Sequence, residues 1–249
     1  EVAFYHMEQG LLLDGVLLED KVPVVLSIYE NRESPSFRAL FDRVFPVLER
    51  TYSGRIELLL LTAQIHAQNE RWHEALEGYL AAISMNPTNY ALYQMAYSLS
   101  QEVGDVDGQI TLLERIEENF NADEDILEGL VFEYYNVGSW ASCARLATAQ
   151  AEMTLDPEVA GNLYALAGTA WFQLDSFELG TVAYKKALDQ ERSPTTLNNY
   201  AWDLATNERN LEFALQLTAE CNASVELEPA FLDTWAWVLY KMGRYAEAQ

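Results

Sequence analysis

The chain has 249 residues, half of them apolar, with 39 acidic residues against 15 basic ones and a formal net charge of −24. Such an acidic surface repels nucleic-acid phosphates and anionic lipid headgroups, so we expect no nucleic-acid partner. The apolar runs are too short for a membrane span, and we expect no direct membrane insertion. One explanation of the acidity is that it keeps the protein soluble. A functional explanation is a preference for basic ligands.

The first 55 residues have the least regular pattern. We expect a helix over 2–14, a second over about 20–30 with Pro23 in its first turn, and a third from Pro35 to about Tyr52. Ser34 precedes this third helix as a potential N-cap, and Ser53-Gly54 ends it. Residues 1–55 are interpreted as a degenerate helical repeat.

From residue 56 onward, one helix–turn–helix pattern recurs. A small or unusual residue opens each expected second helix, in steps of 34, 34, 37, 34 and 34, at Ala75, Gln109, Cys143, Gly180, Ala214 and Ala248. A bulky residue stands three places before each of these, from Trp72 to Tyr245. In the copy over 163–188, Gly168 and Gly180 predict close packing of two helices, because neither carries a Cβ atom.

This period and pattern resemble the tetratricopeptide repeat (TPR) family, in a style typical of bacterial TPR proteins. The resemblance implies an all-α fold, a right-handed superhelical α-solenoid of about six to seven repeats. We expect one continuous domain, with residues 1–55 followed by an array over 56–249. Its units are expected at about 56–89, 90–123, 124–160, 161–193 and 194–228, with a partial unit at 229–249. Because solenoid ends need polar caps, we expect the native chain to continue beyond Gln249.

The sequence offers little support for chemistry. His66, Glu70, His73 and Glu74 are close in sequence, but the expected inter-helix turn separates His66 from His73, so we expect no metal site. No nucleophile motif and no phosphate-binding glycine loop is present, so we expect no enzyme activity and no cofactor. Cys143 and Cys221 are interpreted as free thiols.

In TPR proteins, the first helix of each repeat lines a concave groove. The resemblance implies that the partner-binding residues here are acidic and aromatic, at Asp125, Glu128, Phe132, Tyr135, Phe172, Trp202, Asp233, Trp237 and Tyr240. Lys241 is the one basic residue at the projected groove positions, so the carboxylate clamp of some TPR domains is not expected here. A competing explanation places some of these aromatics in the packing between repeats.

The favoured hypothesis is a non-catalytic scaffold that binds a protein or peptide with basic and apolar residues in its groove. One alternative is a module that guides a cationic polysaccharide in a bacterial export system. Another is a structural solenoid that self-associates. Because a removed leader would explain the start at Glu1, the compartment stays open between the cytoplasm and the bacterial periplasm or envelope.

Overall fold

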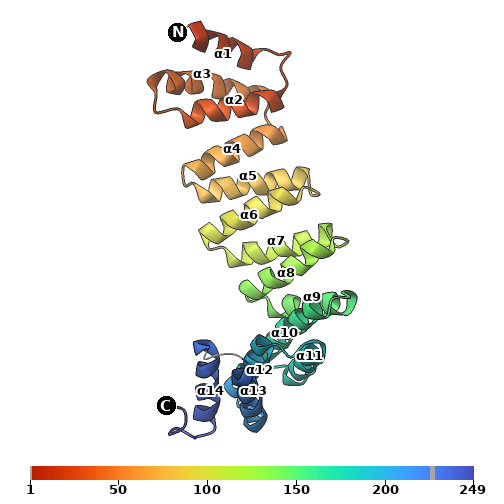
Figure 1. The fold of residues 1–249 in the computed structure, drawn as a ribbon. Coiled ribbons are helices and arrows are strands. Elements are labelled where there is room, and N and C mark those ends of the chain that lie inside the picture. Colours follow the sequence, from red (N-terminus) through yellow and green to blue (C-terminus); the bar gives the residue numbers. More distant parts are fainter. Residues whose placement is uncertain (1, 225–227) are drawn as a thin grey trace. The chain divides into compact units, whose positions relative to one another are not determined.

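The computed structural model describes residues 2–224 and 228–249, and within them it contains fourteen α-helices and no strand (Figure 1). By their internal contacts the helices form two compact units, residues 1–119 and 120–249. Residues 225–227, at the end of the fifth expected repeat, lie outside the described residues. The all-α prediction is confirmed. The division into repeats within one domain stays a prediction.

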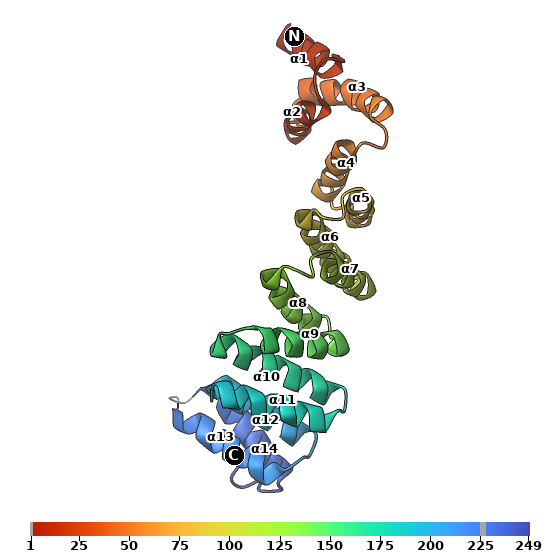
Figure 2. The ribbon, with the colours of Figure 1, turned by 90° about the vertical axis from the view of Figure 1, so that its right-hand side faces the viewer.

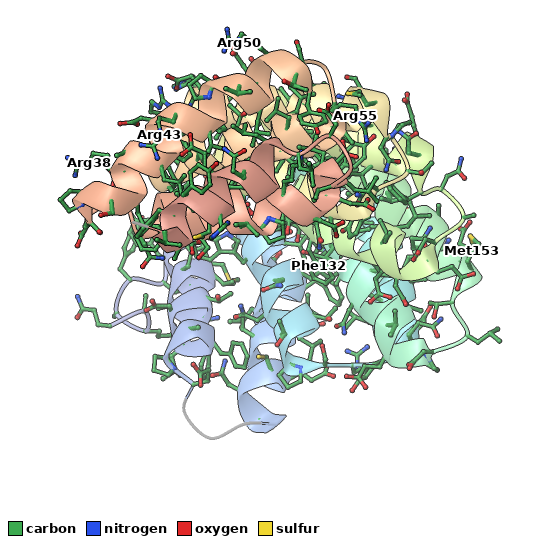
Figure 3. The ribbon with its side chains drawn as sticks, turned by 90° about the horizontal axis from the view of Figure 1, so that it is seen from above. Arg38, Arg43, Arg50, Arg55, Phe132 and Met153 are labelled. Carbon is green, nitrogen blue, oxygen red and sulfur yellow. The ribbon has the colours of Figure 1, made fainter. Side chains whose placement is uncertain are left out.

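The first unit contains seven helices that follow one another in space (Figures 1 and 2). They are α1 (Val2–Leu12), α2 (Leu18–Glu30), α3 (Pro35–Thr51), α4 (Ile56–Gln68), α5 (Trp72–Met85), α6 (Tyr90–Val103) and α7 (Val106–Asn119). Helix α3 packs on both α1 and α2, and α2 also packs on α4. The basic residues Arg38 and Arg50 project outward from α3 (Figure 3).

Two sequence expectations for this region need correction in detail. Helix α2 begins at Leu18, two residues earlier than expected, so Pro23 lies inside the helix rather than in its first turn. Ser34 does precede α3, but its side chain makes no capping hydrogen bond. The loop before α2 is held by the buried Lys21, whose Nζ donates to the Leu13 carbonyl and the Tyr52 hydroxyl, each at 2.9 Å.

The second unit continues the same alternation of first and second helices. It comprises α8 (Glu124–Asn136), α9 (Trp140–Met153), α10 (Pro157–Gln173), α11 (Phe177–Gln190), α12 (Pro194–Thr206), α13 (Leu211–Ser224) and α14 (Pro229–Lys241). Proline at the start of α10, α12 and α14 suits a position whose N–H has no helical partner. Asp156 and Ser193 cap two of these helices by accepting backbone N–H groups.

The turns inside the repeats share a left-handed residue. Gly104, Gly138 and Gly243 have φ between 73° and 76°, and glycine adopts this conformation at no steric cost. Glu70 and Asp175 stand at the corresponding turn positions with φ of 58° and 55°. The repeated turn therefore requires the same left-handed backbone conformation, whether the residue is glycine, glutamate or aspartate.

The paired helices approach closely at small residues, as the glycine pattern predicted. An added Cβ at Gly180 would lie 3.1 Å from the Gly168 carbonyl oxygen and would overlap the ring of Phe172. At Gly168, an added Cβ would lie 2.7 Å from the Tyr184 ring. The α10–α11 pair has no room for a methyl group on either side.

We expect Gly180→Ala to lower the free energy of unfolding by about 1–3 kcal/mol, because the buried Phe172 ring and the backbone of α10 must move. Urea unfolding followed by circular dichroism measures this change. Gly129→Ala in the exposed face of α8 is the matched control, since no atom lies within 4 Å of the new methyl group. That control should stabilise the protein by up to about 1 kcal/mol, and equal destabilisation of both variants would contradict the packing argument.

Candidate binding surface

All nine residues expected to bind a partner lie in the second unit, on its first helices. Asp125, Glu128, Phe132 and Tyr135 belong to α8, and the others to α10, α12 and α14. The structure gives these side chains very different surroundings. Some are exposed, some pack on neighbours, and one is fully buried.

The most prominent feature is a row of four aromatic side chains along α12, α14 and the turn after α14. We call it the aromatic strip, and it consists of Trp202, Trp237, Tyr240 and Tyr245. The Trp202 and Trp237 rings stack with centroids 5.9 Å apart, and Trp237 stacks on Tyr240 at 5.6 Å. Tyr240 in turn contacts Tyr245 at 5.2 Å. The structure thus joins three expected site residues and adds Tyr245, which the sequence analysis named only as a bulky residue that marks the last repeat.

The strip is open to solvent although its residues are large and mainly apolar. The side chains of Trp202, Tyr240 and Tyr245 are 45%, 53% and 59% exposed. Isolated aromatics are common on protein surfaces, but rings in mutual contact form a continuous apolar patch. This patch is the main candidate for a binding surface.

Polar groups border the strip. The Trp237 indole N–H donates to the Thr206 hydroxyl at 3.3 Å. Lys241 lies 5.0 Å from the centre of the Trp237 ring, and its Nζ pairs with Glu208 at 2.9 Å. This hydrogen bond from Lys241 lowers the pKa of Glu208. Because Glu208 neutralises Lys241, the one projected basic residue does not make this surface positive, and Asp233 on the same helix is exposed.

On α8 the expected residues divide into two groups. Asp125 and Phe132 are exposed, Phe132 at 47%, and Glu128 is half-buried. Tyr135 is half-buried and packs edge-on against Trp140 at 5.3 Å. Burial raises the pKa of Tyr135, and the charges of Asp203 and Cys143 add to this effect. Phe132 therefore remains open to a ligand, whereas Tyr135 is partly occupied by packing.

Phe172 does not belong to an accessible surface. Its side chain is 2% exposed and contacts the rings of Phe177, Tyr184 and Tyr200 at 5.7–6.2 Å. It fills the space that Gly180 leaves between α10 and α11. We therefore correct the expectation that Phe172 contacts a partner, because the competing explanation of core packing describes this residue.

Sequence reasoning missed a buried carboxylate next to Trp202. Asp203 is 4% exposed, and its Oδ2 accepts a hydrogen bond of 2.6 Å from the Tyr184 hydroxyl. Since Tyr184 has one proton to donate, the Thr169 hydroxyl, 2.6 Å away, donates to Tyr184. The ring of Tyr184 stacks on Tyr200 at 4.4 Å. One signal in the sequence was a carboxylate within the otherwise apolar run around Leu204 and Ala205.

Burial raises the pKa of Asp203 from 3.8 to about 6, although the hydrogen bond from Tyr184 opposes this shift. Burial likewise raises the pKa of Tyr184 well above its usual value. A carboxyl whose folded pKa exceeds its unfolded pKa adds stability at low pH and loses that contribution as the pH rises through the folded value. Asp203 thus favours the folded state more at pH 5 than at pH 8.

We expect the free energy of unfolding of the wild type, relative to Asp203→Asn, to rise by about 1.4 kcal/mol between pH 8 and pH 5. Urea titrations across this range measure the difference. Asp125→Asn, at an exposed position, is the matched control for the loss of one charge. A constant difference between wild type and Asp203→Asn would show that Asp203 does not titrate with a raised pKa.

Metal binding, cysteine chemistry and membrane insertion were the other possibilities that the sequence raised. Within the described residues, no group of three or more His, Cys, Asp and Glu side chains could hold a metal ion. Burial raises the pKa of Cys143 to about 12, and the buried Cys221 thiol donates to the Pro194 carbonyl at 3.2 Å. None of the described helices combines the length and the apolar character that crossing a membrane requires.

Comparisons with known proteins show which solved structures this fold resembles. No family model matches the sequence, and no curated protein matches it either. One similar solved structure is the C-terminal part of a TPR repeat-containing protein from Cytophaga hutchinsonii, with a TM-score of 0.52 and 14% identity over 91% of this chain and 88% of that one. Another is PilW, a widely conserved type IV pilus biogenesis factor, with a TM-score of 0.51 and 14% identity over 79% of this chain and 89% of that one. The resemblance inferred from the 34-residue period is therefore confirmed at the level of the fold: the chain has the all-α repeat fold of tetratricopeptide-repeat proteins.

Proposed function

We propose that the protein is a non-catalytic scaffold whose aromatic strip binds a segment of a partner protein. The observation that carries this proposal is the continuous contact of four aromatic rings, of which Trp202, Tyr240 and Tyr245 are exposed and Trp237 is half-buried, on α12, α14 and the following turn. Aromatic side chains supply large contact area and commonly dominate binding energy at protein interfaces. The exposed parts of these rings do not contribute to the packing of the second unit itself.

Charge and ring chemistry favour a segment that combines basic and apolar residues. The faces of Trp and Tyr rings attract cations, arginine most often. The nearby Lys241 is neutralised by Glu208, and Asp233 adds an exposed carboxylate on α14. With a net charge of −24, the chain as a whole also attracts basic segments. Asp125, Glu128 and Phe132 on α8 remain proposed additional contacts.

The stacked arrangement bears on the alternative of a cationic polysaccharide. Trp237 stacks on both Trp202 and Tyr240, so its neighbours already cover part of its ring face. A sugar ring needs an open aromatic face to stack on, whereas the apolar side chains of a peptide also pack against ring edges. This argument favours a peptide over a sugar.

The test is a titration of a synthetic peptide that alternates arginine and leucine, measured by isothermal calorimetry. We expect Trp202→Ala/Trp237→Ala to weaken binding at least about tenfold, since two anchors are lost. Added salt should weaken binding to the wild type, because charge attraction contributes to it. A peptide with glutamate in place of arginine should not bind.

Controls keep this test specific. Tyr5→Ala removes an exposed aromatic residue from α1 in the first unit and should leave binding unchanged. Circular dichroism must show equal helicity for all variants. Equal affinity of the wild type and the double variant would refute the strip as the binding surface. Binding of a glucosamine oligomer in preference to the basic peptide would support the polysaccharide alternative instead.

A further inference from the structure

A second candidate site uses none of the residues of the aromatic strip. It is a pocket of about 560 Å³ formed by α10, α11, α12, the turn before α13 and α13 itself. We call it the α11–α13 pocket, and the side chains that define its chemistry are Phe177, Glu178, Lys185, Tyr200, Arg209 and Phe213. Pockets of this size with apolar walls and a few polar groups are typical of ligand sites.

The walls of this pocket are aromatic. Tyr200 is 2% exposed and forms its base, and the Phe213 ring meets Tyr200 edge-on with centroids 5.8 Å apart. Phe177 and Phe213 are half-buried, so each still presents part of its ring to a ligand. An apolar group that entered here would displace water from the exposed parts of Phe177 and Phe213.

Two positive charges line the same pocket, and both lack a carboxylate partner. In this acidic chain, other basic residues of the second unit pair with glutamates at 2.6–3.0 Å, namely Lys186 with Glu152, Arg192 with Glu220, Lys241 with Glu208 and Arg244 with Glu247. Lys185 and Arg209, in contrast, form no ion pair within the described residues. Surplus carboxylates are thus available in the chain, yet these two cations remain free for an external anion.

The backbone fixes where Arg209 lies. Its guanidinium sits 4.3 Å from the centre of the Phe177 ring, and its backbone N–H donates to the Leu204 carbonyl at 2.8 Å. The residues on either side, Glu208 and Asn210, both have positive φ, so Arg209 occupies a tightly defined turn. Lys185 approaches from α11, whereas Lys186, about 100° further around the helix, points to Glu152.

We propose that the α11–α13 pocket binds a carboxylate next to an aromatic side chain, presented by an acidic segment of a partner protein. The ring enters between Phe177, Tyr200 and Phe213, and the carboxylate meets Lys185 and Arg209. Glu178 also lines the pocket, which leaves one net positive charge and matches a monoanion better than a phosphate dianion. This ligand is opposite in charge to the one proposed for the aromatic strip, so the two sites serve different segments.

The test is a fluorescence-anisotropy titration of a labelled peptide in which one tryptophan is flanked by aspartates. Lys185→Gln and Arg209→Gln should each weaken binding roughly tenfold, because each removes a charge-assisted hydrogen bond. Lys186→Gln is the matched control, since its charge is already paired with Glu152 outside the pocket, and it should bind as the wild type does. Circular dichroism confirms that the three variants fold alike.

Further binding measurements distinguish this proposal from the alternative explanations. Trp202→Ala/Trp237→Ala should bind the acidic peptide normally, so failure of the strip and failure of the pocket are distinguishable. Equal binding of a peptide with alanine in place of tryptophan would overturn the aromatic part of the proposal. Equal loss in Lys185→Gln and Lys186→Gln, or no binding to the wild type, would overturn the site. Phenylacetate that binds as tightly as the peptide would overturn the assignment to a polypeptide.

Discussion

The close approach of paired helices is the constraint on which both units depend. At Gly78, an added Cβ would lie 2.7 Å from the Cβ of Ala63, and the α10–α11 pair shows the same closeness at Gly168 and Gly180. Small residues on one helix make room for large rings from the other, such as Tyr184 and Phe172. Since those rings fill the interior, other aromatics of the first helices are left at the surface. The aromatic strip therefore lies at the surface because other rings already fill the interior.

Two surfaces of opposite chemistry lie on the second unit. The aromatic strip has an acidic border and one cation that is already neutralised. The α11–α13 pocket has aromatic walls and two cations without carboxylate partners in the described chain. A single acidic chain can thus offer distinct binding chemistry at different places, because screening at physiological salt limits charge effects to about 8 Å. The net charge is a property of the whole chain, whereas the local ion pairs determine which ligands each surface attracts.

The sequence predicted the fold well because its period is encoded many times. Turn glycines, helix-starting prolines and small contact residues each recur, so an error at one repeat is corrected by the others. The burial of a given side chain, in contrast, depends on its own neighbours and does not recur from repeat to repeat. Phe172 and Tyr240 stand at equivalent positions of their repeats, yet Tyr240 is exposed, whereas Phe172 is buried and fills the space where Gly180 opposite it lacks a side chain. Asp203 was missed for the same reason: its hydrogen-bond partner Tyr184, and Thr169 that bonds Tyr184 in turn, come from other helices.

The interval of 37 residues between the third and fourth copies has a visible structural result. Helix α10 has 17 residues, whereas α8, α12 and α14 have 13 each. Four further residues lengthen a helix by about 6 Å, and the preceding connection carries Leu155, which is 99% exposed. A uniform array has translational symmetry, so a ligand could slide by one repeat and meet the same surface. The longer α10 interrupts this regular repetition within the second unit.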